Sequence, residues 1–334
     1  MSFQHQIISE PIPIHLFIRY KLADKYLDRI REICKEVIIE PWTYGHPEPK
    51  ITHDLTKCNV VLTLGLQDPL NIIDQVPNLE WVQSTSVGLD ALLNPRVKES
   101  SVLLTNTKGC TSVPIAEHTV ALISSLSRGI PMMIRNQQQQ KWELPPVMDL
   151  EKATVGIVGY GEIGKEIAKR CKSFDMNIIG CKKHVGKGKT NDDPADAIVG
   201  LNQIDDVLSQ ADFLVLALPS TDETYHFINK ERLEKMKKGS FLINVGRGNT
   251  IAEDDLLSSL QNGHLTGAAL DVFDVEPLPK EHPFWHLENV IVSPHHAYYS
   301  PKTMDRYMDL FIENLKRFSV GEPLLNVVNK ELGY

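Results

Sequence analysis

The sequence predicts an α/β protein made of two doubly wound domains. Strand-like and helix-like segments alternate along most of the 334 residues, which is typical of parallel sheets covered by helices. A G-x-G-x-x-G segment lies near the middle of the chain, between a strand-like and a helix-like run. The length also suits two domains, at roughly 100–200 residues each.

The first alternating series occupies the amino-terminal third of the chain. Short apolar and β-branched runs predict strands, and one segment has helical spacing. The expected strands are 12–18, 36–39, 60–64 and 79–84, and the expected helix is 24–33.

Residues 113–142 follow a different pattern, with apolar residues at helical spacing. Ser112 can act as a cap and Pro114 fits a first turn. We therefore expect one long helix, kinked near Gly129 and Pro131, that reaches the short glutamine run on a solvated face.

A second series begins at Ala153 and continues to about Pro294, and a last helix is expected at 301–318. The second domain thus lies inside the first along the chain, and both of its ends return to the first domain. This arrangement predicts a cleft between the domains, where ligands of such proteins tend to bind.

Composition limits the functional class. The net charge is −8 with no basic block, which argues against nucleic acid as the main partner. The first residues lack a basic segment followed by an apolar stretch, and no apolar run approaches the ~18 residues of a membrane helix. The five cysteines are scattered without C-x-x-C spacing, so we expect a reduced, cytoplasmic protein without a metal site.

The glycine-rich segment predicts a dinucleotide site. Gly159 allows the tight turn after the strand, Gly161 lets the backbone approach a pyrophosphate, and Gly164 allows close helix–strand packing. The backbone N–H groups near Glu162 and Ile163 then face the phosphates at the start of a helix. A ligand-free glycine turn is the alternative, but the flanking strand and helix are what the binding mechanism requires.

The end of the next strand favours NADP over NAD. An NAD site carries Asp or Glu there to accept hydrogen bonds from the ribose 2′-OH, whereas this chain has Cys181, Lys182, Lys183 and His184. Lysines attract a 2′-phosphate that a carboxylate would repel. The alternative is that both lysines are solvated loop charges. We expect Cys181 to border the adenine.

Three polar residues follow predicted strands of the second series. Arg247 ends the strand-like run 241–247, Glu276 ends the run 267–276, and His295 follows the strand in the run 290–295. Because the carboxyl ends of parallel strands line the ligand crevice, these side chains should converge.

Their chemistry suits hydride transfer to a ketone. His295 can donate a proton to the carbonyl oxygen near neutral pH, and Glu276 can stabilise the imidazolium and orient the ring. Arg247 can bind a substrate carboxylate and stabilise charge on the carbonyl oxygen. His296 competes for the role of acid, but adjacent residues point in different directions, so only one can face the nicotinamide.

The ordered segments together resemble the D-isomer-specific 2-hydroxyacid dehydrogenases. The likeness covers nearly the whole chain and is strongest over 150–297. The matching pieces are TVGIVGYGEIG, ADFLVLALPSTDETYHFINKERLEKMKKGSFLINVGRG, GAALDVFDVEPLP and VSPHHA, with STSVGLD and NTKGCTSVPIAEHTVAL before them.

The resemblance implies a flavodoxin-like substrate domain, 1–110 and 299–334, and a Rossmann nucleotide domain, 111–298, that includes the interdomain helix. It implies a homodimer, and backbone N–H groups of Val87 and Gly88 that hold the substrate carboxylate beside Arg247. Asp271 would contact the nicotinamide carboxamide. The other residues expected to border the cofactor are Leu218, Pro219, Thr224, Val245 and Gly246.

Lys182 stands where many members of that family have Asp, which brings the chain closer to NADPH-using glyoxylate/hydroxypyruvate reductases. We therefore expect reduction of a small 2-oxo acid, glyoxylate, hydroxypyruvate or similar, to the D-2-hydroxy acid. The alternatives are an NAD(P)-sensing corepressor-like protein and a dehydrogenase of another small anion, such as formate or phosphite. Leu64, Trp285, Tyr298 and Tyr299 can shape the substrate pocket or belong to the core.

Overall fold

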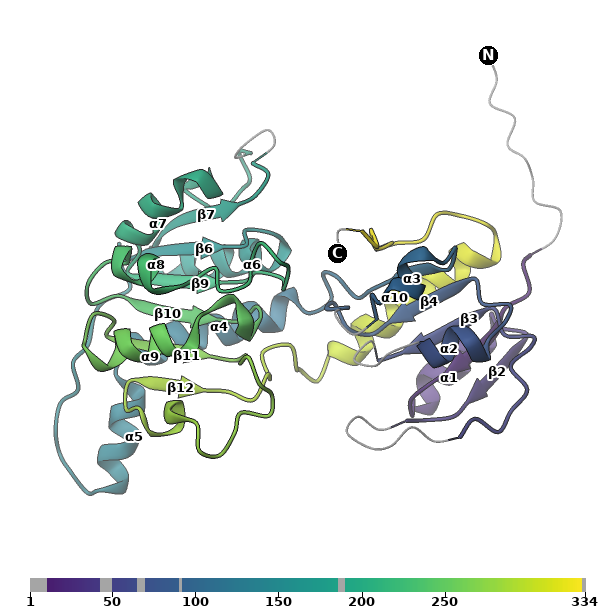
Figure 1. Cartoon of the computed structure of the whole chain (residues 1–334), viewed down its shortest axis with the longest axis horizontal. Coiled ribbons are helices and arrows are strands. Elements are labelled where there is room, and N and C mark those ends of the chain that lie inside the picture. Colours follow the sequence, from purple (N-terminus) through teal and green to yellow (C-terminus); the bar gives the residue numbers. More distant parts are fainter. Residues whose placement is uncertain (1–10, 43–49, 65–69, 90–91, 186–189, 332–334) are drawn as a thin grey trace, which may run out of the picture. The chain divides into compact units, whose positions relative to one another are not determined.

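The protein is described by a computed structural model over residues 11–42, 50–64, 70–89, 92–185 and 190–331. The described residues form two compact units (Figure 1). One unit contains the residues up to Cys110 and those from Pro301 onward, and the other contains Thr111–Ser300.

The first unit is built on a five-stranded parallel sheet with the order β2-β1-β3-β4-β5. This is the flavodoxin-like order, so the predicted fold class is confirmed for this unit. The strands are β1 (His15–Ile18), β2 (Glu36–Ile39), β3 (Val60–Thr63), β4 (Trp81–Ser84) and β5 (Leu103–Thr105). The helices are α1 (Asp24–Arg31), α2 (Leu70–Gln75), α3 (Pro95–Glu99) and α10 (Thr303–Ser319).

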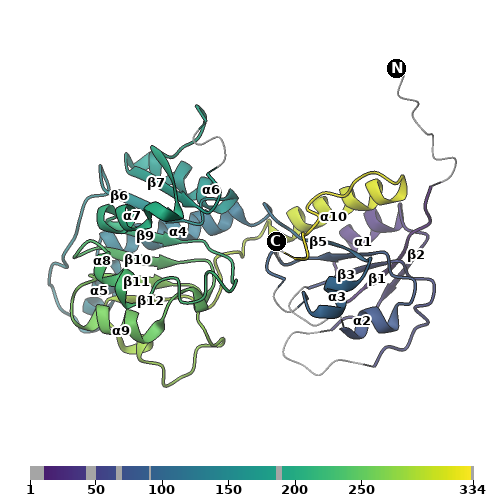
Figure 2. The same cartoon turned by 45° about the horizontal axis from the view of Figure 1, so that its top comes forward.

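Alternating side chains of these strands enter two buried layers. Val60 and Leu62 pack with residues of α1 and α10, whereas Val61 packs with residues of α3 on the other face. Helix α10 lies beside α1 (Figure 2), and Lys25–Asp305 and Arg29–Asp309 ion pairs join them at 2.7 and 2.9 Å. Helix α10, near the end of the chain, is thus part of the same unit as α1, near its beginning.

The second unit contains a seven-stranded parallel sheet with the order β12-β11-β10-β9-β6-β7-β8. Counted from β6, this is the Rossmann order 3-2-1-4-5-6 with a seventh strand at one edge. The strands are β6 (Thr154–Val158), β7 (Asn177–Lys182), β8 (Ala197–Gly200), β9 (Phe213–Leu216), β10 (Phe241–Asn244), β11 (Gly267–Leu270) and β12 (Val290–Val292).

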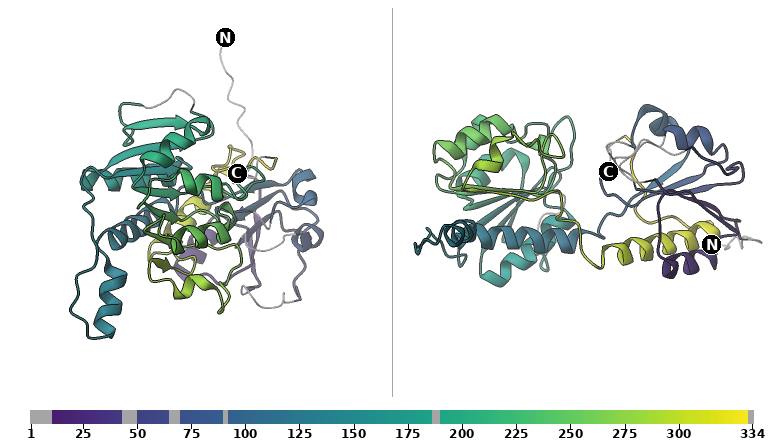
Figure 3. Two further views of the ribbon diagram at one scale, coloured as in Figure 1. Left: turned by 60° about the vertical axis from the view of Figure 1, so that its left-hand side comes forward. Right: turned by 90° about the horizontal axis from the view of Figure 1, so that it is seen from below.

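Helices cover both faces of this sheet (Figure 3). Helices α4 and α6 share one buried layer with the strands, and α7, α8 and α9 share the other. The helices are α4 (Ser112–Ser127), α5 (Ile130–Gln138), α6 (Glu162–Cys171), α7 (Ile204–Gln210), α8 (Lys230–Lys235) and α9 (Glu253–Gln261). Short 3₁₀ turns occur at Lys172–Phe174, Leu201–Gln203, Gly248–Thr250 and Pro283–His286.

The predicted long helix at 113–142 is wrong in one respect, because the structure has two helices, α4 and α5. The break lies at Gly129, whose φ is +63°, in the left-handed region. A Cβ at this position would lie 2.6 Å from the Pro145 side chain, so the following loop packs where only glycine fits. Ser112 is the first helical residue, and Thr111 takes the position before the helix.

The predicted strand 241–247 is also too long, since β10 ends at Asn244. The Asn244 side chain turns the chain there, because its amide N–H donates to the Arg247 carbonyl (2.9 Å) and its oxygen accepts from Gly246 N–H (3.0 Å). Over the described part of the chain, none of the helices has the length and apolar character needed to cross a membrane.

Candidate active site

The glycine loop joins β6 to α6 at the carboxyl end of the sheet. Gly159 has a φ of +93°, and a Cβ there would lie 2.4 Å from the Ala217 carbonyl oxygen. A Cβ at Gly164 would lie 3.1 Å from the Gly159 carbonyl oxygen, which reflects close helix–strand packing. Only glycine fits Gly159, and Gly164 leaves little room for a larger residue.

Gly161 differs from the other two glycines of the motif, because a Cβ there would meet nothing within 4 Å. The open space lies at the first turn of α6, which begins at Glu162. The backbone N–H groups of a first turn have no partner inside the helix. Open space beside Gly161, next to backbone N–H groups that have no partner inside the helix, suits the pyrophosphate of a dinucleotide.

The end of β7 carries the two predicted phosphate-binding lysines, and they differ. Lys182 is half-buried at the last position of the strand, whereas the exposed Lys183 forms an ion pair with Glu223 at 2.5 Å. The expectation for Cys181 is wrong, because its side chain is fully buried in the core and its thiol points to the Gly200 carbonyl (3.7 Å). Burial raises the pKa of this thiol to about 11.

The loops after β9 and β10 pack backbone against backbone. A Cβ at Gly246 would lie 2.6 Å from the Leu218 carbonyl oxygen. The exposed Pro219 begins a turn in which the Thr224 hydroxyl donates to the Pro219 carbonyl (2.7 Å) and accepts from Thr221 N–H (2.8 Å). Val245 and Gly246 are buried beside this turn. These residues follow β9 and β10, which are neighbouring strands. They therefore lie where residues that border a bound cofactor are expected.

Arg247, Glu276 and His295 converge beyond the ends of β10, β11 and β12. The His295 Nδ1 lies 2.8 Å from Glu276 Oε2, and Glu276 Oε1 accepts the Phe273 N–H at 3.0 Å. The Arg247 side chain donates to the Gly246 carbonyl (2.9 Å) and is close enough to act electrostatically on Glu276. Both members of the His–Glu pair remain accessible, at 43% and 35% exposure.

The surroundings of Glu276 favour the ionised form of its carboxyl group. Partial burial raises its pKa, but hydrogen bonds from His295 and Phe273 N–H outweigh burial, aided by the charges of His295 and Arg247. The pKa of Glu276 is therefore lowered overall. An ionised Glu276 accepts the Nδ1–H of His295 and leaves Nε2 as the other ring nitrogen able to exchange a proton.

Asp271 is held differently from the other polar residues at this edge. It is 1% exposed, and its carboxylate accepts the N–H groups of His296 (2.9 Å) and Ala297 (3.0 Å) and the Ser293 hydroxyl. The resemblance assigns Asp271 to the nicotinamide. In this structure its oxygens bind the loop that carries His295.

The aromatic residues near this edge are exposed rather than part of the core. Tyr298 meets the His295 ring edge-on at 6.2 Å, and His296 instead lies beside Tyr299 and His118, at 5.6 and 6.0 Å between ring centroids. Trp285 is exposed and donates to the Pro279 carbonyl. Only His295 of the two neighbouring histidines is paired with Glu276.

Val87 and Gly88 belong to the first unit, in the loop that follows β4. Both are half-buried, and the Val87 carbonyl accepts from the Asn106 side chain at 3.2 Å. Asp90, at the end of the predicted substrate loop, lies outside the described residues. Leu64, after β3, is half-buried.

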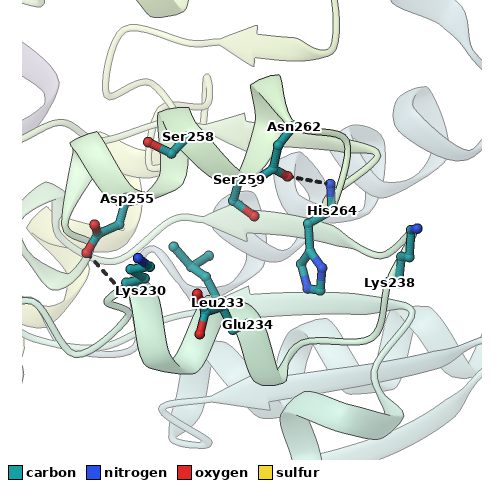
Figure 4. Close-up of a pocket in the computed structure, with 9 residues that line it drawn as sticks. All are labelled: Lys230, Leu233, Glu234, Lys238, Asp255, Ser258, Ser259, Asn262 and His264. Atoms are coloured by element: carbon teal, nitrogen blue, oxygen red, sulfur yellow. Dashed lines mark hydrogen bonds between the residues drawn. The ribbon is translucent and has the colours of Figure 1, made fainter.

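A separate depression of about 430 Å³ lies between α8 and α9 (Figure 4). It is lined by side chains of both charges, including Lys230, Lys238, Asp255 and His264. None of the predicted site residues lines it, so we assign it no part in the chemistry.

Three polar residues were not found from the sequence. Glu223 pairs with Lys183, and His118 and Ser293 join the network around Asp271. His118 and Ser293 are 175 positions apart in the chain. No local motif marks such a contact, so only the folded structure reveals it.

Comparisons with known proteins agree with this geometry. Residues 120–297 match the family model described as "D-isomer specific 2-hydroxyacid dehydrogenase, NAD binding domain". A glyoxylate reductase from Thermofilum pendens is 32% identical over 325 residues, covering 95% of each chain. The chain belongs to the D-isomer-specific 2-hydroxyacid dehydrogenase family, an NAD(P)-dependent class of oxidoreductases.

Two solved structures are similar over almost the entire chain. The first is a D-isomer-specific 2-hydroxyacid dehydrogenase from Xanthobacter autotrophicus Py2 in complex with NADPH and MES. It has a TM-score of 0.83 and 25% identity, and the match covers 97% of this chain and 100% of that one. The second is an NADPH-dependent glyoxylate/hydroxypyruvate reductase from Sinorhizobium meliloti in complex with NADP and sulfate. It has a TM-score of 0.81 and 25% identity, and the match covers 96% and 100%.

Proposed function

We propose that this protein is an NADP-preferring dehydrogenase that reduces a small 2-oxo acid to the D-2-hydroxy acid by hydride transfer. The observation that carries the proposal is the 2.8 Å contact between His295 Nδ1 and Glu276 Oε2, with Arg247 beside it at the same sheet edge as the glycine loop. Glyoxylate and hydroxypyruvate are the proposed substrates. Relatives named glyoxylate reductase support this choice.

Reduction of the keto group needs a proton at oxygen while a hydride reaches carbon. A reduced nicotinamide, when bound, supplies the hydride. His295 donates the proton from Nε2, and Glu276 stabilises the imidazolium through Nδ1–H. Because His295 is 43% exposed, it can regain a proton from solvent after each turnover.

Arg247 and the loop after β4 are assigned to the substrate. The guanidinium binds the substrate carboxylate and stabilises negative charge that develops on the carbonyl oxygen. The backbone N–H groups of Val87 and Gly88 bind the same carboxylate. In this proposal the substrate domain, predicted as 1–110 and 299–334, corresponds to the first unit (Met1–Cys110 and Pro301–Tyr334), and the nucleotide domain, predicted as 111–298, corresponds to the second (Thr111–Ser300).

The residues present fit a dinucleotide. Gly159, Gly161 and Gly164 with the N–H groups of Glu162 and Ile163 would hold the pyrophosphate. The wall formed by Leu218, Pro219, Thr224, Val245 and Gly246 would border the nicotinamide half, and Asp271 would contact the carboxamide.

The proposed preference for NADP depends on the end of β7. Lys182 takes the place where an NAD site needs a carboxylate, and Lys183 lies next to it. The ion pair with Glu223 already offsets part of the positive charge of Lys183. We therefore assign the larger share of 2′-phosphate recognition to Lys182. The neighbours solved with NADP or NADPH support the proposed preference for NADP.

We also propose a homodimer, in the cytoplasm. Apolar side chains are exposed on α5 and the loop after it, where Met133, Ile134, Trp142 and Leu144 lie together in the sequence. Contiguous exposed apolar side chains mark interaction surfaces. All five cysteines are free thiols in the structure, which is compatible with a reducing compartment.

The test is the initial rate of NADPH and NADH oxidation, measured in parallel with a panel of 2-oxo acids that includes glyoxylate and hydroxypyruvate. We expect turnover with a clear preference for NADPH. Tight cofactor binding without turnover of any acid would contradict the proposed reaction, and equal use of both cofactors would contradict the role of the lysines.

A further inference from the structure

A side-chain network links helix α4 to the loop that carries His295. The His118 Nε2 lies 3.1 Å from the Ser293 hydroxyl oxygen and 3.6 Å from Asp271 Oδ1. The Ser293 hydroxyl in turn donates to Asp271 Oδ1. All three residues belong to the second unit, yet they come from α4, from the end of β11 and from the residue after β12.

The direction of these hydrogen bonds follows from the chemistry of each group. The hydroxyl proton of Ser293 goes to the Asp271 carboxylate, so the Ser293 oxygen accepts from His118 Nε2–H. Burial lowers the pKa of His118, the Asp271 charge opposes this, and His296 adds to the lowering. A neutral ring protonated on Nε2 therefore donates to Ser293, which donates to Asp271.

Asp271 connects His118 and Ser293 to the backbone around His295. Its carboxylate accepts the N–H groups of His296 and Ala297, and its carbonyl accepts the N–H of His295 at 2.8 Å. His295 itself has a φ of +49°, in the left-handed region that non-glycine residues seldom adopt. Such a conformation persists only where surrounding contacts fix it.

We propose that His118 and Ser293 are positioning residues, which act through Asp271 to hold the backbone of His295 so that its ring meets Glu276. This inference rests on the proposed role of His295 as proton donor. The site then depends on a residue of α4 that touches neither the ring of His295 nor, in this account, the substrate. Loss of the network lets His295 leave its productive orientation while Arg247 still binds the substrate.

The kinetic test uses Ser293→Ala, which removes the bridging hydroxyl, and Ser293→Thr, which keeps it. We expect Ser293→Ala to lower kcat by roughly 10–100-fold, the cost of slight misplacement of a catalytic group, with KM for the 2-oxo acid within about twofold of the starting protein. Ser293→Thr should restore most of kcat. A normal kcat in Ser293→Ala, or a rise in KM alone, would overturn the proposal.

His118→Leu tests the far end of the network, and His264→Leu is its matched control. His264 is also half-buried and bonds a backbone carbonyl through Nε2 (Met236, 3.0 Å), but it lies beside the depression between α8 and α9. We expect His118→Leu to lower kcat and His264→Leu to leave it unchanged. The double variant His118→Leu/Ser293→Ala should be no worse than Ser293→Ala alone, because both changes break one chain of contacts. Additive losses would overturn a shared network.

A second readout separates this inference from the proposed reaction. In the protein with ¹⁵N-labelled histidine, the Nδ1–H of His295 bound to Glu276 should give its own NMR signal, assigned by its loss in His295→Ala. We expect Ser293→Ala to shift or broaden this signal and His264→Leu to leave it in place. An unmoved signal in Ser293→Ala overturns the positioning role, whereas a protein without turnover that shows the shift loses only the proposed reaction.

Discussion

The sheet edge that carries Glu276 and His295 and the end of β7 are constructed in different ways. At this edge, His295 and Glu276 are fixed by hydrogen bonds, and the buried Asp271 binds the backbone of the loop that carries His295. At the end of β7, Lys183 is exposed and its partner is a surface carboxylate. Preorganised contacts in partly buried sites are worth more than exposed charges, so substitutions should cost far more at the first region than at the second.

The largest expected effect comes from His295→Ala, because it removes the proposed proton donor. We expect kcat for 2-oxo acid reduction to fall by roughly 10²–10⁴-fold, the usual contribution of a positioned acid, with NADPH affinity retained. His296→Ala is the matched control and should have a much smaller effect, since the His296 ring lies beside His118 and Tyr299. The reverse ranking of the two variants would show that the acid has been assigned to the wrong histidine.

Arg247→Lys comes next. Lysine keeps the charge but not the two-pronged geometry that fits a carboxylate. Steady-state kinetics should show a higher KM for the 2-oxo acid and a kcat lower by about 10²-fold, as when one oxyanion donor is lost. Unchanged kinetics would remove Arg247 from the substrate site.

The glycine loop allows a comparison within one motif. Gly161→Ala places a methyl group in open space, so its melting temperature should not change, while NADPH affinity should fall by roughly tenfold as phosphate contacts lengthen. Gly159→Ala meets the Ala217 carbonyl at a φ of +93° and should lower the melting temperature. If Gly161→Ala binds NADPH normally, the open space beside Gly161 does not hold the pyrophosphate.

Lys182→Asp tests the end of β7. The new carboxylate should repel the 2′-phosphate and accept from a ribose 2′-OH, which shifts the NADPH/NADH ratio of kcat/KM toward NADH by roughly 10–100-fold. Lys183→Ala should shift the ratio less, because Glu223 already pairs with that lysine. A ratio that neither variant moves would mean that the lysines are solvated charges.

The smallest expected effect is the pH dependence of stability at Glu276. Its pKa is lowered from 4.5 in the folded protein, so its contribution to the free energy of unfolding is present above pH 4.5 and is lost as the pH falls through the lowered pKa. Urea midpoints should therefore differ between the starting protein and Glu276→Gln at pH 7, and the difference should shrink toward pH 3. A constant difference would exclude the carboxylate charge as its source.

The sequence predicted the fold class because hydrophobic patterning repeats in each βαβ unit, and β2 has the predicted bounds, Glu36–Ile39. The sequence also predicted that Arg247, Glu276 and His295 converge, because residues just after parallel strands meet at one edge of the sheet, and the structure brings them together. The break between α4 and α5 could not be read in this way. It depends on Pro145 packing against Gly129 from a loop that follows α5.

The sequence did not predict the long-range polar contacts either. The burial of Cys181 follows from its position on β7, which is paired on both sides, with β6 and β8, but the sequence around it reads like the end of a strand. The pairing of Lys183 with Glu223 and of His118 with Ser293 joins segments that share no motif. Such contacts depend on tertiary packing, which local patterns do not encode.

The most direct test of the central claim is chiral analysis of the product formed from hydroxypyruvate and NADPH by the purified protein. We predict one D-glycerate for each NADPH consumed, and a rate of product formation that is roughly 10²–10⁴-fold lower with the His295→Ala variant under the same conditions. Formation of L-glycerate, or consumption of NADPH without glycerate, would contradict the proposed function.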